Sequence, residues 1–466
     1  MFFKYFVKRA AFFFETKNNH SLIYSVMALT HVRAPPQVFI PGKNWRLSLA
    51  ELASFLKARK AEFGVHFFSK EFFVVSIKEN SDAWSMADLG GFIKIGAATA
   101  NLSSEIVKKA FIQKNKEAQA QISSDIAHSN LTGDMLKATA EKTFFGVSVY
   151  CAESSLRPFT RIIQRFVGSS VKRELAKNGK KAKFMGFSKE RKYPQLSHIE
   201  VLKKNLVENK AEILFCIGKN QTWISTTTAV HNPFEFQKRD VGKPNQRKIF
   251  AMPPRLARIM VNLASCTSGK LLLDPFCGVG TILQEALLAK ARVLGVDVNP
   301  WCVKAAGENL EWLKKEYGLT EAEHRVLQGD ARTLAQKIGR EEVDCVATEP
   351  DLGPALRHVS TTPYAVKITE KLEPLYYSFM EEAYKVLKTD GRLVLVTPYI
   401  QTRSGQPVTM RIGEKAANVG FKRVYPFPKE IFAESGAAQE NLVKMASLVD
   451  AEERHKIGRE IHIFQK

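Results

Sequence analysis

The sequence of 466 residues lacks a CxxC pair and a long apolar run, and it has few acidic residues for its length. Its six cysteines are scattered, with no histidine nearby at ligand spacing, which argues against a disulfide framework and against a zinc or other metal site. This cysteine usage favours a reducing compartment, so we expect a cytoplasmic protein. No apolar run reaches the ~18 residues of a membrane span, and we therefore expect no membrane partner.

The shortage of acids leaves 69 Lys and Arg against 47 Asp and Glu, a formal net charge of +22. Such an excess attracts polyanions by counterion release and long-range steering, although a merely alkaline protein is the alternative. Hydrophobic content of 45% and charged content of 25% exclude wholesale disorder and fibrous architecture. At about 100–200 residues per domain, the length predicts roughly two to four domains.

Organised sequence begins only at Val38. The segment 1–36 mixes Phe-rich clusters with basic residues and has Glu15 as its only acid. It is either a degenerate targeting peptide or an over-extended start with Met27 as the true initiator. We favour the second interpretation.

The N-terminal half predicts two small α+β units. The first covers 37–142, with strands expected at 38–40, 72–77 and 90–96 and a helix expected at 47–60. The second covers 143–231, with strands expected at 144–150 and 183–187, helices at 159–175 and 198–205, and a hairpin formed by 213–217 and 222–225. The segment 232–250 has the composition of a linker, and its bases from Lys238 to Lys248 add to the positive charge.

Positive charge is concentrated in the second unit. Between Arg161 and Lys192 there are eleven bases and two acids, so this segment carries +9 of the +22. A solvated helix face normally mixes the two signs, and this segment does not. We therefore expect it to bind nucleic acid through phosphate contacts. The candidate RNA-binding residues are Lys172, Arg173, Lys177, Lys180, Lys181, Lys183 and Arg191.

The C-terminal half, 251–466, alternates strands with helices, which predicts a parallel, doubly wound sheet. The expected strands are 271–273, 292–296, 325–327, 343–347, 392–397, 421–425 and 460–464. The expected helices are 281–290, 301–317 and 364–387. The predicted fold class is thus α/β, with a seven-stranded Rossmann-like domain after the α+β units.

The stretch Asp274-Pro-Phe-Cys-Gly-Val-Gly-Thr281 lies between a strand and a helix. Gly278 and Gly280 allow a tight turn and a close approach to a ligand. A dinucleotide would fit such a loop too, but Leu283 occupies the place of the third glycine in that fingerprint.

Acids follow three successive strands, namely Asp274, Asp297 and Asp330. A carboxylate at Asp274 would repel a pyrophosphate but could contact a cationic amine, and Asp297 is placed to hold two ribose hydroxyls. Asp330 could meet an adenine amino group. Together they fit S-adenosylmethionine, whereas a helix N-cap explains one such acid but not three in register.

The fourth strand ends in Thr348-Glu-Pro-Asp-Leu-Gly-Pro354. Methyl transfer to an amine needs acceptors for the amine hydrogens, and Glu349 and the Pro350 carbonyl could serve. Asp351 completes the candidate catalytic set, although a rigid Pro-bounded turn with an exposed acid is the alternative. No Pro-Cys dipeptide is present, which argues against nucleophilic methylation of a pyrimidine carbon.

The run 274–281, preceded by Met252–Leu263 and Phe236–Asp240, resembles the THUMP-domain guanosine-N2 tRNA methyltransferases that modify guanosine 10. The resemblance implies a ferredoxin-like domain, a THUMP RNA-binding domain, a linker and a Rossmann-like methyltransferase domain, in that order. It implies S-adenosylmethionine as cofactor and tRNA as partner, and it leaves open a small activating subunit and the oligomeric state. The candidate cofactor-binding residues are Asp274, Phe276, Gly278, Gly280, Thr281, Asp297 and Asp330.

In the fourth motif the family's Asp-Pro-Pro-Tyr-Gly is replaced by Glu349-Pro-Asp-Leu-Gly353. The acid is longer and the aromatic ring is absent. The function expected is S-adenosylmethionine-dependent methylation of an exocyclic amine of tRNA, above all N2 of guanosine 10. The alternatives are a DNA amino-methyltransferase, which would have to flip its base, and a non-catalytic RNA-binding protein with a vestigial methyltransferase fold.

Overall fold

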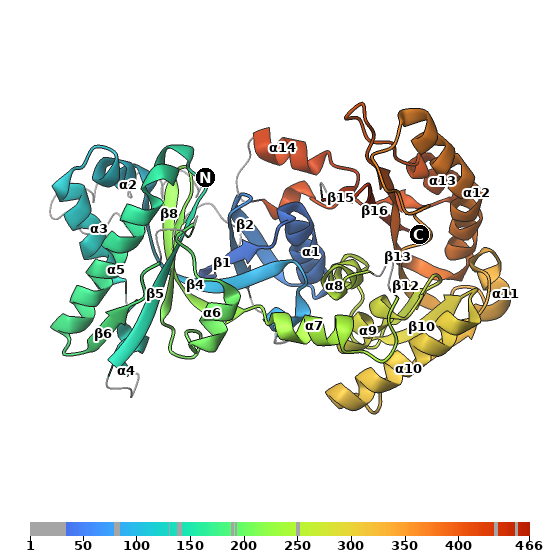
Figure 1. Ribbon diagram of the computed structural model, residues 1–466, viewed down its shortest axis with the longest axis horizontal. Coiled ribbons are helices and arrows are strands. Elements are labelled where there is room, and N and C mark those ends of the chain that lie inside the picture. Colours follow the sequence, from blue (N-terminus) through green and yellow to red (C-terminus); the bar gives the residue numbers. More distant parts are fainter. Residues whose placement is uncertain are drawn as a thin grey trace, which may run out of the picture.

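The computed structural model contains two large sheets joined by a helical connector (Figure 1). The expected extension over 1–36 and the alternative start at Met27 lie outside the described residues, except for 34–36. None of the helices within the described part is long and apolar enough to cross a membrane. The described residues are 34–78, 84–129, 131–137, 142–187, 191, 193–247, 252–432, 437–452 and 455–466.

The first sheet runs through both expected N-terminal units, in the order β2-β3-β1-β4-β8-β7-β5-β6. The long strand β4 pairs antiparallel with β1 on one side and with β8 on the other, and so joins the two halves. The domain limits at 142 and 143 therefore stay a prediction, because the sheet is continuous across them. Its strands are β1 Pro36–Pro41, β2 Glu62–Phe68, β3 Phe73–Lys78, β4 Phe92–Ser103, β5 Lys142–Cys151, β6 Lys181–Phe184, β7 Glu212–Ile217 and β8 Gln221–Val230.

Two groups of helices accompany this sheet. One helix, α1 (Trp45–Ala58), belongs to a core that extends into the C-terminal half. The others surround a separate core that contains Val107 of α2, Ile122 of α3 and Val167 of α5. The remaining elements are α2 Ser104–Phe111, α3 Lys116–His128, α4 Gly133–Lys137, α5 Thr160–Lys177 and α6 His198–Lys203, with short 3₁₀ turns at Met86–Asp88 and Ser154–Phe159.

The second sheet has the strand order β11-β10-β9-β12-β13-β16-β14, with β15 paired to β16. Strands β9 to β13 are parallel to one another and β16 is antiparallel to β13. The predicted Rossmann-like α/β fold is confirmed, and β15 is an additional strand that the sequence did not indicate. The strands are β9 Leu271–Asp274, β10 Arg292–Asp297, β11 His324–Gln328, β12 Val343–Thr348, β13 Leu387–Ile400, β14 Lys422–Arg423, β15 Leu448–Asp450 and β16 Ile457–Gln465.

Helices cover both faces of the second sheet, as its buried parallel strands require. The helices α8, α9 and α10 share a core with α1, while α11, α12 and α13 pack in a core on the other face. The helices are α8 Pro254–Leu263, α9 Thr281–Leu288, α10 Pro300–Tyr317, α11 Leu334–Ile338, α12 Thr362–Val386, α13 Ile412–Val419 and α14 Ala437–Val443, with 3₁₀ turns at Ala331–Thr333 and Lys429–Ile431.

Local sequence explains where α10 begins and ends. The side chain of Asn299 accepts a hydrogen bond from the backbone N–H of Trp301, and Pro300 takes the first helical position, where no N–H is needed. The helix ends at Gly318, which adopts a left-handed conformation at φ 66°. These signals place the start of α10 directly behind the end of β10, where Asp297 lies.

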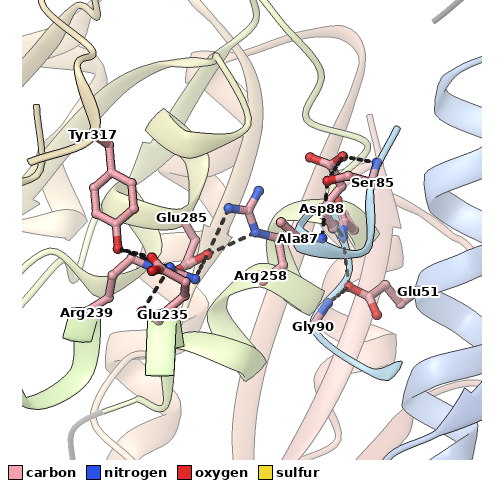
Figure 2. Close-up of polar contacts among 11 residues, drawn as sticks. Glu51, Ser85, Ala87, Asp88, Gly90, Glu235, Arg239, Arg258, Glu285 and Tyr317 are labelled. Atoms are coloured by element: carbon pink, nitrogen blue, oxygen red, sulfur yellow. Dashed lines mark hydrogen bonds and ion pairs between the residues drawn. The ribbon is translucent and has the colours of Figure 1, made fainter. Parts of the chain in front are cut away.

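The predicted linker contains a helix, α7 (Pro233–Val241), and its charges are largely occupied. Arg239 is buried against Glu285 of α9, with 2.6 Å between Nε and Oε1, and Arg258 of α8 contacts the same carboxylate (Figure 2). Lys238 pairs with Glu316. Two of the linker bases, Lys238 and Arg239, are thus paired with acids, and Lys248 lies outside the described residues.

A buried acid, Glu51 of α1, fastens the N-terminal half to the C-terminal half. It accepts hydrogen bonds from the backbone N–H groups of Gly90 and Gly91 and from Nδ2 of Asn262 on α8 (Figure 2 shows the contact to Gly90). Burial raises the pKa of Glu51 to about 7, and the three hydrogen bonds oppose that rise. The helix that precedes β9 is thus fixed to the first sheet.

Candidate active site

The predicted cofactor loop connects β9 to α9 at the carboxyl edge of the second sheet. Gly278 and Gly280 adopt left-handed conformations, with φ of 52° and 85°. A side chain other than glycine would be strained there. A Cβ added to Gly278 would meet no atom closer than Nη1 of Arg247 at 4.0 Å, so the space beside this residue is open. A Cβ added to Gly280 would lie 3.3 Å from Cβ of Ala306, on the packed side of the loop.

Asp274 lies at the point where the strand order reverses, between β9 and β12. Ligands of open α/β sheets bind in the crevice at this point. Its Oδ1 accepts hydrogen bonds from Oγ1 of Thr348 at 2.6 Å and from the backbone N–H of Phe276 at 3.2 Å, and the residue is 2% exposed. Burial raises the pKa of Asp274 to about 7, with further contributions from Asp297 and Glu349. Asp274 thus bridges two strands beneath the crevice.

The neighbouring acids are held by local contacts. Asp297, at the end of β10, accepts hydrogen bonds from the backbone N–H groups of Gly278 and Asn299, both at 2.9 Å. It therefore holds the glycine loop against the next strand. Asp330, after β11, accepts from the backbone and side chain of Arg332, and this pairing lowers the pKa of Asp330. The adenine contact predicted for Asp330 would have to share its carboxylate with Arg332.

Two further residues predicted to bind cofactor are engaged elsewhere. The Phe276 ring packs edge-on against Phe379 at a centroid distance of 5.3 Å. Oγ1 of Thr281 accepts a hydrogen bond from Nζ of Lys243 at 3.1 Å, and Lys243 is 3% exposed. The segment between α7 and α8 thus contacts the first residue of α9 through Lys243. Direct cofactor contacts for these two side chains stay predictions.

The fourth-motif turn follows β12 and is fixed at several points. Glu349 forms a two-point ion pair with Arg459 of β16, and both side chains are mostly buried, at 11% and 13% exposed. Oδ1 of Asp351 accepts from the backbone N–H of Gly353, and the hydroxyl of Tyr376 donates to the carbonyl oxygen of Asp351. The side chain of Asp351 is exposed and serves the turn itself.

This turn still offers acceptors to a ligand. Among the described residues, no hydrogen bond ends on the carbonyl oxygen of Pro350. The Glu349 carboxylate uses one lone pair of each oxygen on Arg459, which leaves the others available. The structure thus brings Asp274, Asp297 and Glu349 to one edge of the sheet, as predicted, because three parallel strands that lie side by side end there.

Sequence reasoning missed two basic residues near this edge. Arg459 lies 110 positions from its partner Glu349, and no local pattern signals such a pair. Arg247 lies beside Gly278, as the 4.0 Å approach above indicates. It stands at the end of the connector, where no motif singles it out. A guanidinium here is suited to a carboxylate ligand.

Six of the seven candidate RNA-binding residues lie on another part of the molecule, in the second half of α5, on β6 and between the two (Figure 1), and Arg191 follows β6. Lys172, Arg173, Lys177 and Lys181 are exposed. Arg191 differs, because its guanidinium contacts Glu200 at 2.8 Å and donates to the carbonyl oxygen of Gln195 at 2.9 Å. Two neighbouring bases of the same segment, Lys189 and Lys192, lie outside the described residues.

The residues at the crevice suit the chemistry of S-adenosylmethionine. Two left-handed glycines give close backbone approach, Asp297 lies at the second strand end, and Arg247 offers a cation for a carboxylate. The fit is better for an amino-acid-bearing nucleoside than for a dinucleotide, because the carboxyl groups of Asp274 and Asp297, which have no cationic partner among the described residues, would oppose a pyrophosphate.

Two family models match the chain, and both describe methyltransferases. Residues 244–404 match a family described as RMKL-like, methyltransferase domain, and residues 111–308 match a family described as DNA methylase. The first match contains the glycine loop, Asp297, Asp330 and the fourth-motif turn.

Individual relatives narrow this class. The chain is 36% identical over 163 residues to a tRNA (guanine(10)-N2)-dimethyltransferase of Methanothermobacter thermautotrophicus, covering 34% of this chain and 42% of that protein. Proteins of the same name from Methanocaldococcus jannaschii and Pyrococcus abyssi are 31% and 30% identical, covering 42% and 49% of this chain and 52% and 62% of their own lengths. The chain thus spans about half the length of the curated relatives it matches. The predicted resemblance to guanosine-N2 tRNA methyltransferases is confirmed as sequence similarity, whereas a THUMP domain stays a prediction.

Proposed function

We propose that this protein transfers a methyl group from S-adenosylmethionine to an exocyclic amine of tRNA, namely N2 of guanosine at position 10. The observation that carries the proposal is the pairing of the open glycine loop with the Glu349-Pro350 turn across the reversal of strand order. The names of the similar archaeal proteins indicate the substrate. The charge at the end of α5 supports RNA as the polymer.

When bound, S-adenosylmethionine supplies an electrophilic methyl group. The chain supplies position and orientation. The carbonyl oxygen of Pro350 and a free lone pair of Glu349 accept the two hydrogens of the target amine, so that the nitrogen lone pair points toward the methyl group. Arg459 fixes the carboxylate of Glu349 at two points, and Tyr376 fixes the turn through the Asp351 carbonyl. Such positioning of two reactants is a major source of rate enhancement.

The side chain of Glu349, which is longer than that of the family's aspartate, is used for an ion pair. A glutamate reaches Arg459 on β16, and the pair anchors the turn to that strand. Leu352 packs on the hydrophobic core instead of offering a ring to the base. We therefore expect base positioning to depend on hydrogen bonds more than on stacking at this turn.

Methyl transfer to polymers tests the proposal. The full chain is incubated with S-adenosylmethionine labelled in its methyl group and with bulk tRNA or duplex DNA, and acid-precipitable label is counted. Label is expected in tRNA and not in DNA. Label in DNA would instead support the function named by the second family match. Cofactor binding by calorimetry without label in either polymer would favour a non-catalytic RNA-binding protein.

Substitution of the acceptor tests the mechanism. Glu349→Ala is expected to lower the rate of transfer on the order of 10²-fold, because the amine has one acceptor fewer. Cofactor binding by the same variant serves as the control for an intact site. Unchanged transfer would remove Glu349 from the catalytic set.

A further inference from the structure

A cavity lies at the opposite edge of the second sheet from the glycine loop. It has a volume of about 470 Å³, is open to solvent on one side, and is lined by residues from the end of α1, from β14 and from the 3₁₀ turn at Lys429–Ile431. A smaller cavity of about 220 Å³ adjoins it and shares Lys57 and Arg392 with it. The larger cavity alone is of the size that holds a nucleotide, and the smaller one is lined in addition by Lys270, Asp344 and Asp390.

The place of the cavity separates it from the candidate active site. Arg392 of β13 pairs in register with Cys345, near the start of β12, whereas Glu349 follows the end of that strand. Glu349 lies four positions after Cys345, which is about 13 Å along an extended strand at ~3.3 Å per residue. The two sites therefore open at different edges of one sheet.

The walls of the larger cavity carry four cations and one acid. The cations are Lys57, Arg392, Arg423 and Lys429, and the acid is Glu430. Among the described residues, no carboxylate lies within ion-pair distance of Lys57 or Lys429. Burial lowers the pKa values of Lys57 and Arg392, as is expected where cations are gathered and partly removed from water.

Arg392 is held with part of its guanidinium free. Its Nη1 donates to Oγ of Ser265 at 2.7 Å and to the carbonyl oxygen of Leu263 at 3.4 Å. Within the described part, neither Nε nor Nη2 takes part in a hydrogen bond or ion pair. The backbone and a hydroxyl thus orient the guanidinium, while two of its nitrogens are left to a ligand, an arrangement suited to a phosphate.

An aromatic ring stands beside these cations. Tyr425 lines the cavity and is 50% exposed, between Val424 and Pro426. An exposed ring next to clustered cations is the arrangement with which proteins bind unpaired nucleotides, because the ring stacks on a base while the cations contact phosphate.

We propose that this cavity binds an unpaired nucleotide of an RNA strand, with the phosphate against Arg392, Lys57 and Lys429 and the base on Tyr425. The choice of RNA as the source rests on the proposed function, whereas the phosphate and base chemistry does not. The cavity would give the substrate a second point of attachment, apart from α5 and apart from the turn at Glu349.

Fluorescence polarisation of a labelled single-stranded RNA pentamer against the full chain tests this assignment. The double variant Lys57→Gln with Lys429→Gln changes two exposed side chains that lack ion-pair partners in the described part. For each phosphate that is no longer bound, we expect affinity to weaken about five-fold at 0.1 M salt and the slope of log affinity against log salt to fall by about 0.7. Tyr425→Ala is expected to weaken binding about ten-fold without changing the slope, and Tyr425→Phe to preserve it.

The matched control is Lys304→Gln with Lys315→Gln, which removes the same charge from exposed positions on α10. Competition by adenosine monophosphate tests whether the cavity binds a nucleotide of an RNA strand or also a free nucleotide. Weakening of pentamer binding alone assigns the cavity to an RNA strand, and equal weakening of mononucleotide binding extends it to free nucleotides. Equal affinities of the parent, cavity variants and control would overturn the proposal. Because the readout is binding, a chain that binds the pentamer but methylates no polymer would contradict only the proposed function.

Discussion

Replacing Asp274 by asparagine tests the buried carboxyl beneath the glycine loop. Both hydrogen bonds to Asp274 end on Oδ1, so asparagine can keep them and imitate the protonated acid. Burial raises the pKa of Asp274 from 3.8 to about 7 in the folded chain. The folded state therefore holds this proton more tightly than the unfolded state, and the free energy of unfolding falls as pH rises between the two pKa values.

The magnitude follows from the size of that shift. Each pKa unit corresponds to about 1.4 kcal/mol, so the stability of the parent falls by about 4 kcal/mol over the whole interval and by about 3 kcal/mol between pH 5 and pH 8. The Asp274→Asn variant has no such titration. Its free energy of unfolding, relative to that of the parent, is therefore expected to rise by about 3 kcal/mol from pH 5 to pH 8.

Urea unfolding followed by circular dichroism at pH 5, 6, 7 and 8 measures this difference. Asp390→Asn is the matched control, because Asp390 is exposed and its hydrogen bond from Gln465 can be kept by the new amide oxygen. The difference in stability between Asp274→Asn and the parent is expected to change with pH by more than the difference between the control and the parent. Equal changes for the two variants would refute the reasoning.

Three further predictions concern the loop, the ion pair and the basic surface. Arg459→Met is expected to lower the free energy of unfolding by about 3–5 kcal/mol, because it leaves the mostly buried Glu349 without its partner. Adding Glu349→Leu to this variant should restore most of that stability in urea unfolding. Additive destabilisation by the two substitutions would contradict this prediction. Gly278→Ala is expected to weaken cofactor binding in calorimetry and to lower the free energy of unfolding by about 1–2 kcal/mol, because Gly278 has a left-handed backbone conformation. Gly307→Ala, in the open middle of α10, is the control and should leave the free energy of unfolding unchanged or raise it. Lys172→Gln with Arg173→Gln on the exposed face of α5 is expected to weaken tRNA binding, as measured by filter binding. The slope of log affinity against log salt should fall by about 0.9 for each phosphate that is no longer bound. An unchanged slope would remove these residues from the RNA surface.

The second sheet could be predicted from the sequence because its signals are local. Strands such as β10 and β12 are short apolar runs bounded by helices, and the acids that follow them mark the carboxyl edge. Since parallel strands end at the same edge, the meeting of Asp274, Asp297 and Glu349 could be inferred from the chain alone.

What the sequence did not predict depends on contacts between distant segments. The ion pair between Glu349 and Arg459 joins the turn after β12 to β16, and neither residue has a local signal for it. The helix α7 was interpreted as a linker because its Pro, Gly and basic residues are typical of loops, yet Arg239 is buried against Glu285 of a later helix. Strand β6 begins and ends two to three residues earlier than the expected 183–187, because its pairing with β5 sets its register.

The most direct test of the proposed activity is the position of the transferred methyl group. Two tRNA transcripts that differ only at position 10, with guanosine or adenosine there, are incubated with the full chain and S-adenosylmethionine, digested, and analysed by mass spectrometry. We expect N2-methylated guanosine in the fragment that contains position 10 of the first transcript, and no new modification in the second. Equal modification of both transcripts, or of neither while the cofactor is bound, would contradict the proposed activity.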